Sequence, residues 1–446
     1  MNKKIPNLIT ELPGPKGKVF LDKNAENVSP SLPHAYPLVI KEALGCEVTD
    51  LDGNTFLDCA AGIAVCSTGH CHPKVVKAIQ DQAAKLIHIC GADFYDPNYI
   101  NLCERLGNLA PGDGQKKVFL GNSGAEAVEA AIKLSRNHTK RSHLIAFYGA
   151  FHGRTMGAVS LTASKPIYHE GFGPLLPDVS HVPYAYCYRC SFNLTYPECD
   201  LACVDHIENT LFAHTIVPEE VAAIFIEPVQ GEGGYIVPPN GWLEKLRKLC
   251  DKYGILMIVD EVQSGIGRTG KMFAIEHWGV VPDITLSAKS LASGMPLSAM
   301  IAKEDVMTWK PGSHGSTYGG NPVATASAAA TLDVIEGEGL MENAQKVGSA
   351  LMENLNGIAK SSKMIGDVRG LGLMIGVEMV KDKTTKERAK YETDEVMNAC
   401  FERGLMVLPC GPNSIRFSPP LNITQQEADT AVEIFAESLF DVEKKL

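Results

Sequence analysis

One lysine of the chain stands where it could act as a nucleophile. Lys289 lies in LSAKSLASGMPLSA, residues 286–299, a segment without acidic residues in a chain whose formal net charge is −11. The preceding DITLS predicts a buried strand. A lysine is most often a solvated surface residue. One that is desolvated at a strand end has a lowered pKa, and its neutral amine can form a Schiff base with an aldehyde.

A carboxylate is expected at the end of a neighbouring strand. Asp260 follows five apolar residues, 255–259, that predict a buried strand. Because an unpaired charge there is costly, Asp260 needs a cationic partner. A salt bridge or a turn cap would explain an isolated aspartate. Lys289, however, follows about thirty residues later, as an adjacent strand of one sheet would place it.

The third candidate is an anion-binding turn. KKVFLGNSGAEAVEAAIKLSR predicts a strand that passes through residues 121–124 into a helix. Ser123 can cap that helix, and Glu126 is expected to complete a capping box. Free backbone N–H groups and the positive end of the helix dipole would then suit a phosphate. A well-capped helix without a ligand is the alternative.

Together the three features meet the requirements of pyridoxal 5'-phosphate. The turn would hold the phosphate, Lys289 would react with the aldehyde, and Asp260 would keep the pyridine nitrogen protonated so that the ring accepts electrons. A dinucleotide-dependent oxidoreductase is a rival, because Gly265, Gly267 and Gly270 form a GxGxxG pattern. That pattern should open a long helix, with an acid about 20 residues later, and KMFAIEHWG is a poor helix.

The surrounding elements predict an α/β protein. Apolar strands such as VAAIFIEPV alternate with amphipathic helices such as NGWLEKLRKLCDKYG, which indicates a mostly parallel sheet covered by helices. Ligands of such sheets gather at the carboxyl ends of the strands, where the three candidates lie. We expect a large cofactor-binding domain over 61–333 and a small α/β domain over 334–446, to which an N-terminal segment, 1–60, contributes.

Composition excludes several classes of protein. The acidic balance argues against a nucleic-acid-binding or anionic-membrane surface. No stretch approaches the ~18 uncharged apolar residues of a membrane span, and Pro6, Asn7 and Glu11 interrupt any secretion signal. We therefore expect a cytoplasmic protein that acts on small molecules.

Thirteen cysteines are expected to be reduced in such a chain. Four of them follow the pattern C-x2-C-x8-C-x3-C, namely Cys187, Cys190, Cys199 and Cys203. The spacing is close to that of a zinc ribbon but has a short middle segment. A structural zinc, a disulfide pair and unlinked loop thiols all remain open. None of these supplies the chemistry, and no metal is predicted in the site itself.

From about residue 35 to 435 the sequence resembles the class III aminotransferases of fold type I. The segments that carry the resemblance occur in the family's order and near its spacings: NSGAEAVEAA, FHGRT, EPVQGEGG, DEVQSGIGRTG, AKSLASGMPLSA, HGSTYGGNP and IGDVRGLGLMIGVEMV. The resemblance implies a large domain whose mostly parallel sheet is sandwiched by helices, a smaller α/β domain, and pyridoxal 5'-phosphate as cofactor.

The resemblance also implies roles for individual residues. Lys289 would carry the Schiff base and shuttle the proton, and Asp260 would pair with the ring nitrogen. Phe151 would stack on the ring face, although an ordinary core aromatic is the commoner explanation. Gln263 would approach the ring hydroxyl.

The phosphate site is expected to combine two subunits. Its own-chain residues would be Ser123, Gly124 and Ala125. Thr317 of HGSTYGG would be contributed by the partner subunit of a homodimer or a dimer of dimers, so that a monomer should be inactive.

Four residues bear on the substrate. Arg416 in SIRFSPPL matches the family's carboxylate-binding arginine, and Glu232 matches the glutamate that pairs with it; such a pair suits a switch between two substrates. A surface or interdomain ion pair is the alternative. Ile63 and Arg154 match positions that line the pocket in 4-aminobutyrate aminotransferases, where the arginine would bind the distal carboxylate.

The predicted reaction is ω-transamination. An amino group would move from an ω-amino acid like 4-aminobutyrate to 2-oxoglutarate by a ping-pong mechanism. A racemase or epimerase of the same family is the first alternative; it would use the same lysine with a proton donor on the opposite face, which the sequence does not identify. Ornithine or acetylornithine transamination is the second, although ornithine-type members resemble one another in a tyrosine near Ile63 that this chain lacks.

Overall fold

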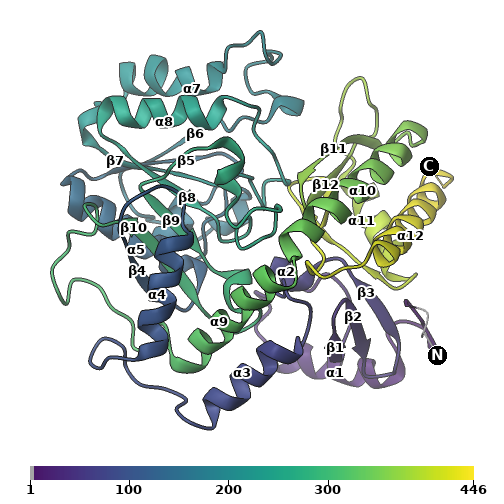
Figure 1. The fold of residues 1–446 in the computed structure, drawn as a ribbon. Coiled ribbons are helices and arrows are strands. Elements are labelled where there is room, and N and C mark those ends of the chain that lie inside the picture. The colour runs from purple at the N-terminus through teal and green to yellow at the C-terminus, as the bar shows by residue number, and fades with distance from the viewer. Residues whose placement is uncertain (1–4, 446) are drawn as a thin grey trace. The chain divides into compact units, whose positions relative to one another are not determined.

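The computed structural model describes residues 5–445, which form two compact units (Figure 1). One unit contains Lys74–Met341. The other contains the described residues up to Pro73 and those from Glu342 onward. The chain therefore changes unit at 73/74 and 341/342, whereas the domain boundaries expected from the sequence were 60/61 and 333/334.

The larger unit is built on a seven-stranded sheet in the order β4-β10-β9-β8-β7-β5-β6. The strands are β4 Lys116–Gly121, β10 Ser298–Lys303, β9 Ile284–Ser287, β8 Leu256–Asp260, β7 Val221–Ile226, β5 His143–Phe147 and β6 Val179–Val182. Strand β10 is antiparallel to both of its neighbours, and the other pairings are parallel. Every residue of β7 is buried, as expected of a parallel strand covered on both faces. The predicted mostly parallel sheet is confirmed.

Helices cover both faces of this sheet. Helix α5, Gly124–Thr139, packs across the middle strands with a buried row of small and aliphatic residues that includes Ala127, Ala131 and Leu134. Helix α8, Trp242–Tyr253, lies on the other face (Figure 1), where the Trp242 ring packs edge-on against Phe147. The other α-helices of this unit are α3 Pro73–Ala83, apart from its first residue, α4 Pro97–Leu109, α6 Met156–Leu161, α7 Ala202–His206 and α9 Pro322–Gly337.

The smaller unit holds two four-stranded sheets, β1-β2-β3-β13 and β11-β12-β15-β14. The first joins β1 Ile40–Leu44, β2 Glu47–Asp50 and β3 Thr55–Asp58 to β13 Leu405–Met406, which runs parallel to β3. The second contains β11 Ile365–Leu371, β12 Met374–Met379, β15 Ser414–Phe417 and β14 Leu408–Cys410. Parallel pairing of β3 with β13 ties the N-terminal segment to the C-terminal region.

Four longer helices complete the smaller unit: α1 Pro15–Asn27, α10 Leu340–Ser361, which begins two residues before the unit boundary, α11 Lys390–Phe401 and α12 Gln425–Glu443. Between α1 and α3, the short turn α2, Ala61–Ala64, has left-handed backbone angles. No helix among residues 5–445 combines the length and the apolar character needed to cross a membrane.

Candidate active site

The predicted chemical groups of the larger unit follow the carboxyl ends of its strands. Asp260 is the last residue of β8, and Lys289 begins the turn directly after β9. The two strands are parallel neighbours in which Asp260 pairs in register with Leu286, so both groups leave the sheet at the same edge. Ser123 follows β4 at that edge, because β4 is antiparallel to β10 and β10 is antiparallel to β9.

Lys289 has an uncommon backbone conformation. Its φ is 35°, in the left-handed region that residues other than glycine rarely adopt. Such conformations persist only where the surrounding structure imposes them, and they are concentrated at functional sites. The side chain is half-buried.

The turn before α5 is arranged differently from the predicted capping box. Ser123 Oγ accepts a hydrogen bond from the Glu126 N–H at 3.3 Å, as expected of an N-cap. The Glu126 carboxylate, however, accepts from the backbone N–H and the side-chain amide of Asn122 at 2.7 and 2.9 Å. The predicted capping box, in which Glu126 would accept the Ser123 N–H, is therefore wrong. The N–H groups of Gly124 and Ala125 have no acceptor within the helix. Together with the helix dipole they suit an anion.

Two glycines bring the neighbouring loops against this turn. A Cβ on Gly124 would lie 2.8 Å from Val262 Cγ1 of the loop after β8. A Cβ on Gly153, whose φ is +136°, would lie 2.7 Å from the Cβ of Ala125. Any side chain at either position would therefore separate the loops that carry Phe151 and Asp260 from the start of α5.

The cationic partner that Asp260 requires is His152. The Nδ1 atom of His152 lies 2.7 Å from Asp260 Oδ2, and both side chains are buried. The second carboxylate oxygen accepts the backbone N–H of Val262 at 3.0 Å. Burial opposes protonation of His152, but the hydrogen bond and the charge of Asp260 outweigh it and raise its pKa. His152 was not predicted, although FHGRT contains it, because nothing in the sequence links this motif to Asp260.

A second buried acid, Glu227, ties two loops of the site together. Its carboxylate oxygens accept the backbone N–H of Phe151 at 3.1 Å and that of Gly231 at 3.0 Å. Burial, opposed by the charge of His152 and reinforced by that of Asp260, raises the pKa of Glu227 to about 7. Glu227 was not predicted either. Its signal in the sequence is an acid directly after the buried strand β7, comparable to Asp260 at the end of β8.

Gln263 is held beside the same loop. Its Oε1 accepts the Tyr235 hydroxyl at 2.8 Å. A Cβ on Gly231 would lie 2.7 Å from Gln263 Nε2, so the glycine makes room for the amide.

A group of charged and aromatic side chains lies on the loops after β5 and β7. The guanidinium of Arg154 is 4.8 Å from the ring centre of Tyr168 and 6.0 Å from that of Phe151. Lys165 Nζ pairs with Glu232 Oε1 at 2.7 Å, and the Tyr168 hydroxyl donates to the same oxygen at 3.5 Å. Within residues 5–445, Arg154 is exposed and forms no ion pair. Lys165 is a second cation of this group, and it was not predicted from the sequence.

Three predicted site residues do not lie among the charged and aromatic side chains around Arg154. Ile63, in α2, and Arg416, in β15, belong to the smaller unit, so the pairing of Arg416 with Glu232 stays a prediction. Thr317 is exposed on the loop before α9. That loop is anchored by Ser316, whose Oγ lies 3.2 Å from the side-chain amide nitrogen of Asn122.

The four spaced cysteines are unlinked thiols in the structure. They line a small cavity together with Tyr196 and Pro239. Across residues 5–445, no group of three or more His, Cys, Asp or Glu side chains is arranged to hold a metal ion.

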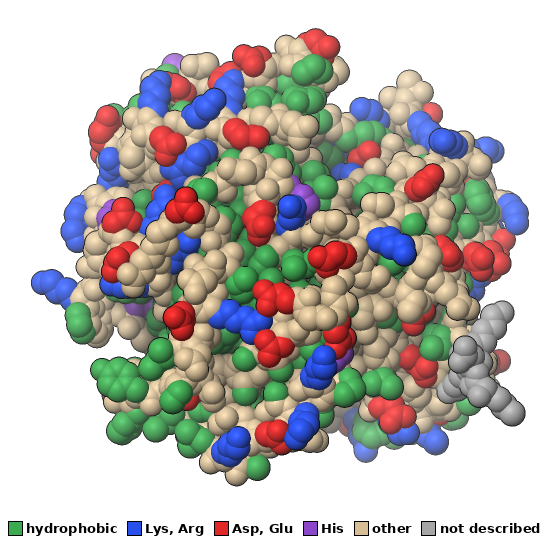
Figure 2. Space-filling view, viewed as in Figure 1, with side chains coloured by type: hydrophobic (Ala, Val, Ile, Leu, Met, Phe, Trp, Pro, Cys, Tyr) green, Lys and Arg blue, Asp and Glu red, His purple; other side chains and the backbone are tan. Residues whose placement is uncertain are grey.

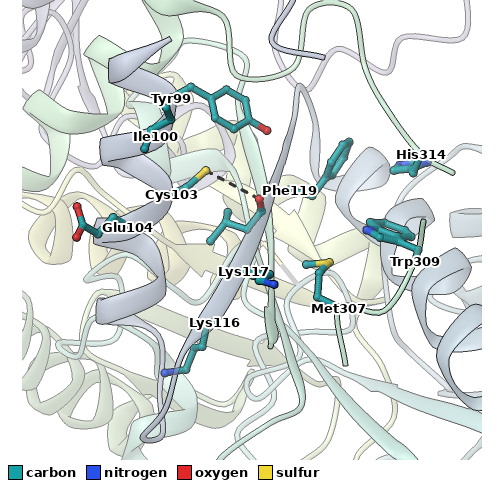
Figure 3. A pocket seen from close by; sticks show the side chains of 11 residues that line it. Tyr99, Ile100, Cys103, Glu104, Lys116, Lys117, Phe119, Met307, Trp309 and His314 are labelled. Carbon is teal, nitrogen blue, oxygen red and sulfur yellow. Dashed lines mark hydrogen bonds between the residues drawn. The ribbon is translucent and has the colours of Figure 1, made fainter. Parts of the chain in front are cut away.

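A separate cavity of about 520 Å³ flanks the edge strand β4 (Figure 3). Tyr99 and Cys103 of α4 line one side, and the rings of Phe119, Trp309 and His314 line the other. The Cys103 thiol donates to the Val118 carbonyl at 3.9 Å. This cavity contains none of the predicted site residues.

The groups at the carboxyl edge of the sheet fit pyridoxal 5'-phosphate. The N-terminus of α5 offers hydrogen-bond donors to a phosphate. Asp260, matched by a buried imidazole of raised pKa, suits a protonated pyridine nitrogen. Lys289 follows the adjacent strand with the primary amine that the cofactor's aldehyde requires.

Comparisons with known proteins agree with this chemistry. The sequence profile of the family described as Aminotransferase class-III matches residues 29–439. The 4-aminobutyrate aminotransferase of Escherichia coli strain K12 is 41% identical over 432 residues, 96% of this chain and 99% of the relative. The alanine/serine racemase of Pyrococcus horikoshii is 40% identical over 443 residues, 98% and 93% of the two chains.

A solved structure extends the agreement to the fold. The (S)-enantioselective omega-transaminase from Thermomicrobium roseum is similar with a TM-score of 0.88 at 34% identity, over 95% of this chain and 98% of that one. The predicted fold type and cofactor are confirmed. The chain therefore belongs to the class-III aminotransferases, pyridoxal-phosphate-dependent enzymes of fold type I.

Proposed function

We propose that the enzyme is an ω-aminotransferase that moves the amino group of a 4-aminobutyrate-like donor to 2-oxoglutarate. The observation that carries this proposal is the state of Arg154. Its guanidinium is exposed, rests on aromatic rings only, and follows the same strand as Phe151. A donor with a carboxylate at the end away from its amine would supply the missing anion, because guanidinium and carboxylate pair in a bidentate manner.

Pyridoxal phosphate, when bound, supplies the electron-accepting ring on which amino groups are exchanged. The N-terminus of α5 would hold its phosphate, and Phe151 would cover one ring face. Asp260, paired with His152, would hold the proton of the ring nitrogen. Gln263, fixed by Tyr235, would face the ring hydroxyl. Lys289 would take the proton from the substrate carbon and return it.

One pocket must accept both substrates in turn. We expect Arg416 to bind the carboxylate next to the reacting carbon, with Glu232 masking it when the donor has none there. The ion pair of Glu232 with Lys165 gives the glutamate a second partner when Arg416 is occupied. Ile63 would border the space for the donor's carbon chain.

The active enzyme is proposed to be a homodimer or a dimer of dimers in the cytoplasm. The exposed position of Thr317 would let it reach the phosphate site of a partner subunit. Six of the exposed large apolar side chains of the same unit come from residues 86–100 and from the loop of Thr317: Leu86, Ile87, Phe94, Tyr95, Ile100 and Tyr318. Figure 2 shows apolar side chains gathered over the segment between α3 and α4. Exposed apolar patches of this kind mark protein interfaces.

A donor panel with 2-oxoglutarate tests the substrate assignment. 4-Aminobutyrate should give glutamate and should bleach the visible band of the bound cofactor when the 2-oxo acid is left out. Ornithine and N-acetylornithine complete the panel. If either is used and 4-aminobutyrate is not, the donor class is wrong.

A racemase is the second candidate, because a relative that covers nearly the whole chain is named alanine/serine racemase. A racemase would invert L-alanine or L-serine without a 2-oxo acid and leave the visible band nearly unchanged. Chiral chromatography of each amino acid, with and without 2-oxoglutarate, separates the two activities.

A further inference from the structure

Three side chains of the smaller unit form a Cys–His–Asp group. Asp58, at the end of β3, places its Oδ2 2.7 Å from Nε2 of His70. Its other oxygen accepts the backbone N–H groups of Ala60 and Ala61 at 2.7 and 3.0 Å, which fixes the carboxylate. The ring of His70 also hydrogen-bonds with the thiol of Cys66.

The backbone holds this group in place. The backbone of His70 exchanges two hydrogen bonds with Gly45, of 2.9 and 3.0 Å, and the Gly69 N–H closes a turn onto the carbonyl of Cys66 at 3.1 Å. Histidine and cysteine therefore sit at the two ends of one anchored turn. Asp58 is buried, and Cys66 is half-buried and so accessible to a small reagent.

His70 places a positive charge beside the Cys66 thiol. Burial opposes protonation of His70, but its hydrogen bonds to Asp58 and Cys66 raise its pKa to about 10. His70 is therefore an imidazolium at neutral pH. An imidazolium that donates to a cysteine stabilises the thiolate, the form that reacts.

We propose that Cys66, held beside a cationic His70, is a modification site for small disulfides and soft electrophiles. With a disulfide such as oxidised glutathione, the Cys66 sulfur attacks one sulfur atom of the disulfide. A new S–S bond joins Cys66 to that half, and the original S–S bond breaks. The other half leaves with the electron pair as a thiolate and takes a proton from water. Cys66 is oxidised and the departing half is reduced.

Other thiols of the chain provide the contrast. Burial raises the pKa of Cys250 and of Cys400 to about 12, so both stay protonated and inert. Cys71 is exposed on the same segment as Cys66 and is a natural reference for an ordinary accessible thiol.

Modification of Cys66 would act on the turn α2. A Cβ on Gly62 would lie 4.0 Å from Cys66 Sγ, so an adduct on the sulfur would press on that turn. Ala61, Gly62, Ile63 and Ala64 all have positive φ, between 48° and 65°, a strained run for residues with side chains. If Ile63 borders the donor site, modification lowers transaminase activity. This consequence rests on the proposed function.

Alkylation of the holoenzyme tests the reactivity of Cys66. With limiting iodoacetamide at pH 7 and peptide mass spectrometry, Cys66 should be modified at least ~10-fold faster than Cys71 in the same molecule. His70→Gln should bring the rate of Cys66 down to that of Cys71, whereas His72→Gln on the same segment should not. Equal rates in the unaltered enzyme would overturn the proposal whether or not the variants fold.

The consequence for activity has its own readout. Oxidised glutathione should add one glutathione to Cys66 and lower transamination, and dithiothreitol should reverse both. Cys66→Ser should keep its activity throughout. Full activity of the modified enzyme would refute the effect on α2. An enzyme that labels at Cys66 but never transaminates 4-aminobutyrate would refute the proposed function and leave the modification site standing.

Discussion

At the scale of single residues, the site depends on charges that are matched inside the protein. Asp260 and His152 neutralise each other in a buried pair, and Glu227 is stabilised by two backbone N–H groups. Arg154, in contrast, is left with aromatic contacts. The groups whose charges the fold satisfies are those we propose to position the cofactor, and Arg154, which has no ion pair among the described residues, is the one we propose to bind the substrate.

Lys289→Ala should abolish both turnover and covalent capture of the cofactor. The variant lacks the amine that reacts with the aldehyde and moves the proton, and a positioned proton-transfer group contributes ~10²–10⁴-fold to the rate. Borohydride treatment followed by peptide mapping should label residue 289 in the unaltered enzyme only. Retention of labelling or of turnover in the variant would refute the role of Lys289.

Arg154→Gln should weaken binding of the donor's distal carboxylate. A hydrogen bond to a charged group is worth roughly 1.5–3 kcal/mol, so the KM for 4-aminobutyrate should rise about 10–150-fold with an unchanged cofactor spectrum. A monoamine donor without a carboxylate is the internal control, because its KM should not rise. An equal rise for both donors would show that Arg154 acts on the site's structure instead.

Glu227 should make stability depend on pH in the mildly acidic range. Its folded pKa of about 7 lies above the ordinary value of 4.5, so between these values the unfolded chain loses the proton that the folded protein keeps. Stability should therefore fall as pH rises from 4.5 to 7, by on the order of 1–3 kcal/mol. Glu227→Gln should remove that slope in denaturant unfolding measured across this range. If the variant keeps the same pH dependence of stability, another titrating group causes it.

At the scale of elements, the site is an arrangement of loop ends around the start of α5. The loops after β5 and β8 reach the first turn of the helix only because Gly153 and Gly124 have no side chains there. Capping by Ser123 then leaves the following N–H groups directed out of the helix. The proposed phosphate site thus depends on the packing of neighbouring loops as much as on the helix itself.

Gly153→Val should separate the FHGRT loop from α5. The new Cβ would overlap Ala125, and overpacking of this kind costs about 1–3 kcal/mol. We expect a lower unfolding temperature and loss of bound cofactor on gel filtration. Gly171→Val is the matched control, because Gly171 also has positive φ, +79°, but open space around its Cβ. Similar loss of cofactor in both variants would point to backbone strain alone.

At the scale of the whole molecule, the exposed apolar side chains of the larger unit indicate a protein–protein interface. Ile87 and Tyr95 are 67% and 94% exposed, although burying such side chains is favourable by about 1.5–3 kcal/mol each. We infer that the surface containing them is covered by a second copy of the chain, as the proposed sharing of Thr317 requires.

Ile87→Glu should weaken that association. A charge on the covered surface must be desolvated on dimerisation, so sedimentation velocity should show more monomer at a given concentration, with a proportional loss of turnover. Val217→Glu is the control, since Val217 is also an exposed apolar residue, at 54%, but is not one of the six side chains assigned to that surface. An unchanged dimer fraction in Ile87→Glu would place the interface elsewhere.

The sequence by itself determined the features that neighbours in the chain impose. Five apolar residues before Asp260 predict a buried strand, and the serine before GAEAVEAA predicts a helix start, because strand burial and helix capping are local effects. The motifs also sufficed to assign the fold type and the cofactor. The motifs did not predict the hydrogen-bond partner of the Glu126 carboxylate, because Asn122 and Ser123 both have a backbone N–H that it could accept.

Only the tertiary structure decided which groups meet. His152 pairs with Asp260 across 108 residues, and Glu227 holds Phe151 across 76. Both contacts exist because β5, β7 and β8 lie side by side in a sheet whose strand order differs from the order of the chain. The interactions that stabilise this strand order are distributed over the whole core, so no single segment of the sequence specifies it. The partner of a buried charge therefore becomes visible only when the strands are in place.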